Sequence, residues 1–98
     1  MSTSEAYKAE IDRYLEGFAA NVRRLRTAGA TGRSQEWLAG ATRLHRTEIG
    51  RIEQGEVEPR LSTLVILADG LSVTVDDLVA GLWVPVERKP PPPSRLRQ

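Results

Sequence analysis

The sequence predicts a single all-α domain of five helices joined by short connections. Two patterns support this fold class. Apolar residues recur at three- and four-residue spacings, and each such segment lies between residues that favour helix starts and glycines that favour helix ends. The length of 98 residues is a third constraint. A chain this short can bury one compact core, but not a core and a deep substrate cleft as well.

A long amphipathic helix is predicted for residues 4–28, ended by Gly29 and Gly32. Gly17 lies inside the pattern, where it costs about 1 kcal/mol, and this leaves a break near Gly17 open. One stripe of apolar side chains defines the inner face of this helix: Ile11, Leu15, Phe18, Val22 and Leu25.

Two short helices are predicted next, over residues 35–42 and 46–54. Ser34 favours the start of the first as an N-cap, and His45 occupies the same position before the second. Gly55 follows the second helix, as a glycine at the C′ position does. The connection between the two helices is therefore only a few residues long.

A fourth helix is predicted over residues 61–69, and Gly70 is expected to stop it. Its inner side would carry Leu61, Leu64, Val65 and Ala68. A fifth helix is predicted over residues 75–82, because Thr74 and Asp77 have the spacing of a capping box.

The two ends of the chain differ from the middle. Residues 1–17 are predicted to form an N-terminal helical extension, residues 18–82 the main domain and residues 83–98 an extended tail. The tail contains four consecutive prolines, which favour polyproline II or disorder. The extension is either docked on the domain or a helix for dimerisation or a partner protein.

Composition excludes several classes of function. The chain has no cysteine and one histidine, so disulfides, thiolate catalysis and Cys- or His-cluster metal sites are excluded, and no cofactor is expected. No phosphate-binding loop and no carboxylate pair opposite a base is present, so an enzyme is not expected. The polar N-terminus and the lack of a long apolar run predict a cytoplasmic protein without a membrane span.

The net charge of +1 does not by itself indicate a nucleic-acid partner. However, the positive charge is concentrated: residues 23–60 hold eight basic and five acidic side chains, a sum of +3. The two short helices and their approaches are therefore the basic part of the chain. With few phosphates neutralised, we expect weak and salt-sensitive nonspecific binding to DNA.

The two short helices form the most informative constellation. Two helices on so short a turn must cross steeply, which leaves the second protruding, and a helix of this size fits the major groove of DNA. Arginine suits guanine, and threonine suits a thymine methyl group or a phosphate. The alternative for Arg46 and Arg51 is that they are solvated surface residues. The outward face of residues 46–54 consists of Arg46, Thr47, Gly50 and Arg51, with Gln54 near the end.

A set of residues along positions 18–82 resembles the Cro/C1-type (XRE-like) helix-turn-helix family of prokaryotic regulators. The set includes an Arg-rich first helix, a Ser-Gln start, a Leu-Ala pair and an apolar pattern that leads to an Ile-Glu-x-Gly end. The residues are Phe18, Val22 to Arg26, Ser34, Gln35, Leu38, Ala39, Leu44 to Ile49, Ile52, Glu53, Gly55, Pro59 to Leu61, Thr63, Leu64 and Leu71 to Val73.

The resemblance implies a compact, five-helix, lambda-repressor-like fold and a homodimer on double-stranded DNA. It implies a transcriptional regulator, here predicted to be a repressor. Bases would be read by Arg46, Thr47, Gly50 and Arg51. Phosphates would be held by Gln35 and Arg60, with Arg43, Arg33 and His45 as further candidates.

The chain departs from the family pattern at the turn between the two short helices. Arg43 stands where the family has a glycine with positive φ, so it either strains the turn by about 1 kcal/mol or the turn is rearranged. Thr42 replaces an apolar residue beside it. Trp37 lies at a usually polar position, and it either packs on the N-terminal extension or is exposed at a partner site.

The rival hypothesis is a protein-interaction module, such as an antitoxin or an anti-repressor partner. It would use the N-terminal helix or the apolar residues 83–86. The arginines of the first helix have a structural reading too, in which one of Arg23, Arg24 and Arg26 pairs with Glu53 beneath the protruding helix.

Overall fold

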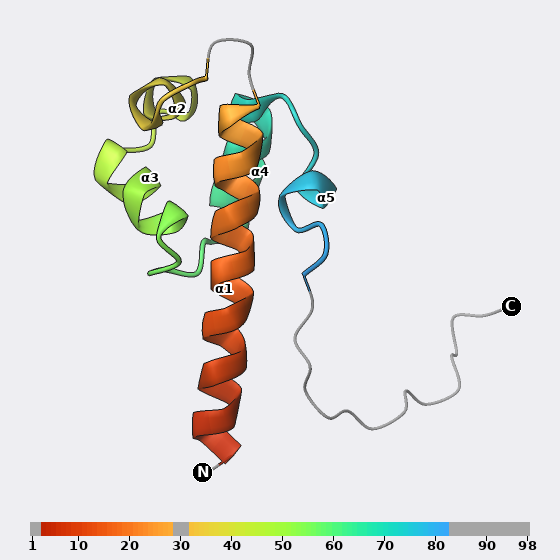
Figure 1. The fold of residues 1–98 in the computed structure, drawn as a ribbon. Helices are drawn as coiled ribbons and strands as arrows, with labels where there is room; N and C mark the ends of the chain where they lie inside the picture. The colour runs from red at the N-terminus through yellow and green to blue at the C-terminus, as the bar shows by residue number, and fades with distance from the viewer. Residues whose placement is uncertain (1–2, 29–31, 83–98) are drawn as a thin grey trace, which may run out of the picture.

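The structure is a computed structural model that describes residues 3–28 and 32–82 (Figure 1). The predicted Pro-rich tail at residues 83–98 lies outside the described residues, as does Trp83. The described part of the chain contains five helices and no strand, which confirms the predicted fold class. The helices are α1 (Thr3–Thr27), α2 (Gln35–Thr42), α3 (Arg46–Glu53), α4 (Leu61–Leu71) and α5 (Val75–Leu78).

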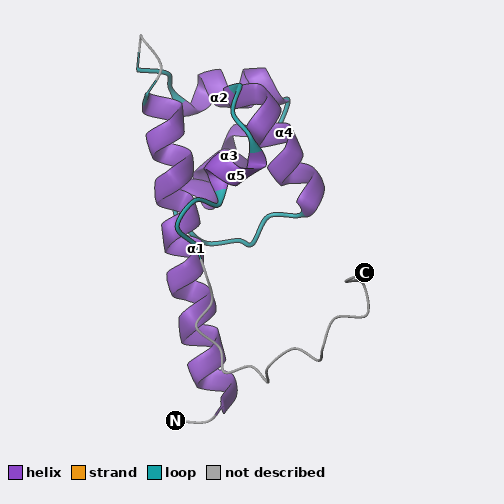
Figure 2. Cartoon of the chain, turned by 90° about the vertical axis from the view of Figure 1, so that its right-hand side faces the viewer, coloured by secondary structure: helices purple, strands orange, loops and turns teal. Residues whose placement is uncertain are grey.

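Helix α1 is continuous through Gly17, so the helix has no break there. A methyl group on Gly17 would lie 2.7 Å from Cδ2 of Leu82, and the glycine thus leaves room for the chain that follows α5. The N-terminal half of α1 projects beyond the other helices (Figures 1 and 2). Its C-terminal half lies among them.

All five helices contribute to one hydrophobic core. The core forms because each helix directs an apolar stripe inward. Its buried members are Phe18, Val22, Leu38, Ile49, Ile52, Leu67, Ala68, Leu71 and Leu78. Residues Val22, Leu38, Ile49, Leu67 and Leu78 have no measurable exposure. Helix α3 packs into this core through Ile49 and Ile52, which lie on its inner face.

The prediction that Gly70 stops the fourth helix is wrong. Helix α4 continues to Leu71 and ends at Ser72, which adopts the left-handed conformation with φ of 57°. The N–H of Val73 then donates to the carbonyl of Ala68 at 2.9 Å. Gly70 instead permits close helix packing, because a methyl group there would lie 2.6 Å from Cγ2 of Thr42 on α2.

The predicted inner side of the fourth helix is wrong in part. Leu61 and Val65 are 74% and 54% exposed. Ala68 is buried as predicted, but Thr63, Leu67 and Leu71 complete the face that packs inward. The reason is that α4 is apolar on most sides, so its periodicity does not identify one face.

The fifth helix starts as predicted but is shorter. The hydroxyl of Thr74 accepts from the N–H of Asp77 at 3.1 Å, and Oδ2 of Asp77 accepts from the N–H of Thr74 at 3.0 Å. Helix α5 ends at Leu78 because Nδ2 of Asn21 on α1 donates to the carbonyl of Leu78 at 2.9 Å. The N–H of Leu82 bonds to the carbonyl of Val79 instead.

Candidate nucleic-acid interface

The turn between α2 and α3 is stabilised by side chains of α2. The predicted N-cap of α2 is confirmed, with Oγ of Ser34 accepting from the N–H of Trp37 at 3.0 Å. Thr42 closes the other end of α2. Its hydroxyl donates to the carbonyl of Leu38 at 2.7 Å and accepts from the N–H of Leu44 at 3.2 Å. At a position where the family has an apolar residue, Thr42 thus makes two hydrogen bonds through its hydroxyl.

Arg43 adopts the left-handed conformation that the turn requires, with φ of 63°. A non-glycine residue in this region costs about 1–2 kcal/mol. The hydrogen bonds of Thr42 flank this strained position and offset part of that cost. The turn therefore keeps the family geometry without a glycine, and the Arg43 side chain is exposed.

Both ends of α3 are capped as the sequence predicts. Nδ1 of His45 accepts from the N–H of Thr47 at 3.0 Å. At the other end, Gly55 has φ of 72°. The N–H of Glu56 donates to the carbonyl of Arg51 at 3.0 Å, and the N–H of Gly55 to that of Ile52 at 3.1 Å. These bonds form a Schellman motif.

The outer face of α3 is a continuous exposed surface. Arg46, Thr47 and Arg51 are exposed and Gly50 is half-buried, whereas Ile49 and Ile52 are buried. Residues 46 and 50 and residues 47 and 51 each lie one turn apart, so the four form two adjacent rows on one side of the helix. The structure thus brings the four predicted base-contacting residues together on one face.

A buried ion pair holds α3 against α1. Nε of Arg26 lies 2.7 Å from Oε2 of Glu53, and the Nη2 of Arg26 donates to Oε1 at 2.8 Å. The two side chains are only 13% and 1% exposed. The hydrogen bond from Arg26 to the carboxylate raises the pKa of this guanidinium. Arg23 donates to the backbone carbonyl of Glu53 as well, so the predicted pairing is confirmed for Arg26.

The start of α2 joins the same network. Gln35 is half-buried, and its Nε2 donates to Oε1 of Glu53 at 3.2 Å. Arg33 just before α2 is used differently. Its guanidinium donates to the carbonyls of Arg26 and Leu25 at 3.1 and 2.8 Å. Its Cζ also lies over the ring of Trp37, 4.2 Å from the ring centroid. Arg33 therefore joins the end of α1 to α2, while its predicted phosphate contact stays a prediction.

A groove of about 690 Å³ lies beside α3, between this helix, residues 57–60 and the start of α4. His45, Thr47, Arg51 and Arg60 all line it. Four residues that the sequence assigns to DNA contacts therefore open onto one groove. Glu48 and Glu58 also line this groove, so its charge is mixed.

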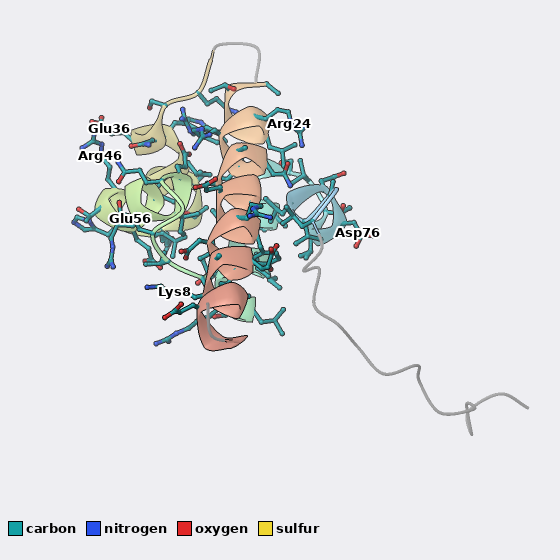
Figure 3. The ribbon with its side chains drawn as sticks, turned by 60° about the horizontal axis from the view of Figure 1, so that its bottom comes forward. Lys8, Arg24, Glu36, Arg46, Glu56 and Asp76 are labelled. Atoms are coloured by element: carbon teal, nitrogen blue, oxygen red, sulfur yellow. The ribbon has the colours of Figure 1, made fainter. Side chains whose placement is uncertain are left out.

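Arg46 lies at the other edge of the face, next to α2. Its Nε is 3.6 Å from Oε1 of Glu36, and the side chains are 63% and 77% exposed. Figure 3 shows this pair on the opposite side of α1 from Asp76. Glu36 is a member of this surface that the sequence patterns above do not single out. Its position in the first turn of α2, one residue after Gln35, is the signal that could have shown it.

Within the described ranges the chain has neither a metal-binding cluster nor a membrane-spanning helix. No group of three or more His, Cys, Asp or Glu side chains in residues 3–28 and 32–82 could hold a metal ion. No helix in those ranges combines the length and the apolar character needed to cross a membrane.

Comparison with known proteins identifies the family. The family described as "Helix-turn-helix domain" matches residues 18–82. The chain is similar to "Control protein C.SmaI" of Serratia marcescens, with 45% identity over 64 residues, covering 65% of this chain and 74% of that protein. No solved structure gives a significant match. The chain belongs to the Cro/C1-type helix-turn-helix family of DNA-binding transcriptional regulators.

Proposed function

We propose that the chain is a repressor that binds double-stranded DNA by placing the outer face of α3 in the major groove. The observation that carries this proposal is the division of α3 into two faces. Ile49, Ile52 and Glu53 are buried, and this leaves the opposite side, with Arg46 and Arg51, free for a ligand. A helix that protrudes in this way matches the width of the major groove.

The base contacts in this proposal come from the two rows on α3. Arg46 and Arg51 have the fork of donors that matches the N7 and O6 acceptors of guanine, and each such pair discriminates by about 1–3 kcal/mol. Thr47 offers a methyl group and a hydroxyl. Gly50 has no side chain, so it lets the helix backbone approach the bases closely.

The phosphate contacts come from residues around α3. Gln35 begins α2, and Arg60 lines the groove on the other side of α3. Arg43 and His45 are exposed in the turn between α2 and α3. Arg33 is the least available of the five, because two of its nitrogens already donate to carbonyls of α1.

A homodimer is part of the proposal. A two-fold dimer would place two copies of α3 about 34 Å apart, on successive turns of the major groove. Leu61 and Val65 support a protein contact on α4, because they are apolar, exposed and one helical turn apart. Burial of these two side chains in an interface would stabilise a dimer, because it removes apolar surface from water.

Selection of bound duplexes from a random DNA pool by the full chain tests this function. We expect one enriched motif, an inverted repeat whose half-sites are centred one helical turn apart. Failure to enrich any sequence would refute sequence-specific DNA binding. It would favour the rival function, a protein-interaction module that uses the projecting half of α1.

A further inference from the structure

The contact between Gln35 and Glu53 joins the start of α2 to the end of α3. These residues are 18 positions apart, and the Nε2 to Oε1 distance is 3.2 Å. The side chain of Glu53 is almost fully buried and is already held by two hydrogen bonds from Arg26. The acceptor that Gln35 meets is therefore fixed in place by α1 rather than free to follow the amide.

The chemistry of this acceptor determines which way the Gln35 amide faces. Both oxygens of the Glu53 carboxylate accept hydrogen bonds from Arg26, and a carboxylate oxygen that is already an acceptor suits a further donor and not another acceptor. The NH₂ group of Gln35 must then face Glu53, because the amide oxygen would be repelled there. One of the two N–H groups is used by Glu53, and the second remains as a donor.

The amide oxygen occupies a defined place as well. It lies 3.9 Å from the point that a methyl group on Gly50 would take. Gly50 belongs to the outer face of α3 and is half-buried. The amide of Gln35 therefore lies beside the proposed DNA-contacting rows, in a space that the missing side chain of Gly50 leaves open.

We infer that Glu53 is a positioning residue for DNA binding, which holds the Gln35 amide so that its second N–H donates to a DNA phosphate. A phosphate only accepts hydrogen bonds, so an N–H is the part of the amide that suits it. This inference rests on the proposed function, and it assigns Glu53 an effect on DNA that it exerts only through Gln35.

NMR of the unmodified full chain tests the inference without any folding risk. The side-chain NH₂ resonances of Gln35 are assigned by their loss in Gln35→Ala. The duplex recovered by selection is then added. We expect one of the two Hε2 protons to shift strongly on binding, while the other stays bonded to Glu53 and shifts little. Equal shifts of both protons, or of neither, would overturn the inference although DNA binding itself is present.

A double-mutant cycle gives the matching energetic test, with the Kd measured at a temperature where every variant is folded. Gln35→Ala should weaken binding at least about tenfold per half-site, on the selected duplex and on a scrambled duplex alike. Glu53→Gln should weaken binding in the wild-type background but not further in Gln35→Ala. Equal losses in both backgrounds, or a Gln35→Ala loss confined to the selected duplex, would contradict the assignment.

Asp76→Asn is the matched control for the loss of a carboxylate. Asp76 is exposed on α5, on the opposite side of α1 from the Glu36–Arg46 edge (Figure 3). Its substitution should leave the Kd unchanged within error. A Kd effect of Asp76→Asn as large as that of Glu53→Gln would show that net charge, and not the position of Gln35, accounts for the loss.

Discussion

Removal of Arg26 should destabilise the whole domain. In Arg26→Ala, the carboxylate of Glu53 would stay buried, with a side chain only 1% exposed, after losing two hydrogen bonds of 2.7 and 2.8 Å. The bond from Arg26 to the carbonyl of Arg33 at 2.7 Å would be lost too. Breaking a buried ion pair from one side costs about 3–5 kcal/mol, against a typical total stability of about 5–15 kcal/mol.

Urea unfolding at neutral pH, followed by far-UV circular dichroism, measures this loss. Arg24→Ala is the matched control, because Arg24 is exposed on the same helix and its side chain donates to Asn21 of that helix at 3.3 Å. We expect the control to change the free energy of unfolding by less than about 0.5 kcal/mol. The m-value should be the same for both variants, which would show that the extent of unfolding is unchanged.

The double variant Arg26→Met with Glu53→Met keeps the test decisive where Arg26→Ala is largely unfolded. Replacing both partners by apolar residues of similar volume is often neutral or stabilising, because no charge is left buried. We therefore expect the double variant to regain most of the stability. An Arg26→Ala loss no larger than that of Arg24→Ala, or a double variant less stable than Arg26→Ala, would refute the reasoning.

Three further predictions concern packing, charge and pH. Gly70→Ala should lower the melting temperature, because its new methyl group would lie 2.6 Å from a threonine of α2, and overpacking costs about 1–3 kcal/mol. Gly40→Ala, with nothing within 4 Å, should instead raise it, and a rise for both would contradict the packing argument. Glu36→Gln should tighten DNA binding by up to about fivefold in fluorescence anisotropy, because it frees Arg46 from an exposed ion pair worth at most about 1 kcal/mol. Weaker binding by Glu36→Gln would contradict a role of this pair in limiting DNA binding. The backbone N–H of Thr74, the N-cap of α5, donates to Asp77 and lowers the pKa of this carboxyl below its usual 3.8. The ionised Asp77 therefore stabilises the fold above pH 3.8, and this stabilisation is lost as the pH falls through the folded-state pKa. The difference in unfolding free energy between wild type and Asp77→Asn should therefore shrink in acid, and a difference that grows on acidification would exclude this role.

The local parts of the fold could be predicted from the sequence because local chemistry determines them. Ser34, His45 and Thr74 cap their helices as expected, and Gly55 ends α3 in the left-handed conformation. The face of α3 also follows from its periodicity, because its apolar residues fall on one side. For the turn the sequence leaves strain at Arg43 and a rearranged turn both open, and the positive φ of Arg43 shows that the first holds.

The predictions that were wrong concern residues whose surroundings depend on which helices pack together. Gly70 has the usual sequence signature of a helix end, but in the fold it is a contact between α4 and α2. The exposure of Leu61 and Val65 likewise depends on where α4 lies against the core. The bond between Gln35 and Glu53 could not be predicted, because no periodic pattern relates the start of one helix to the end of the next.

The most direct test of base contacts by the outer face of α3 is to compare the DNA motifs selected by the wild-type chain with those selected by two arginine variants. Arg51 lies on the outer face of α3, whereas Arg60 lies directly before α4 and lines the groove beside α3. Arg51→Ala should flatten the preference at one base pair of each half-site, and Arg60→Ala should weaken binding to all sequences alike. A motif that Arg51→Ala leaves unchanged would contradict the central claim that α3 reads the bases.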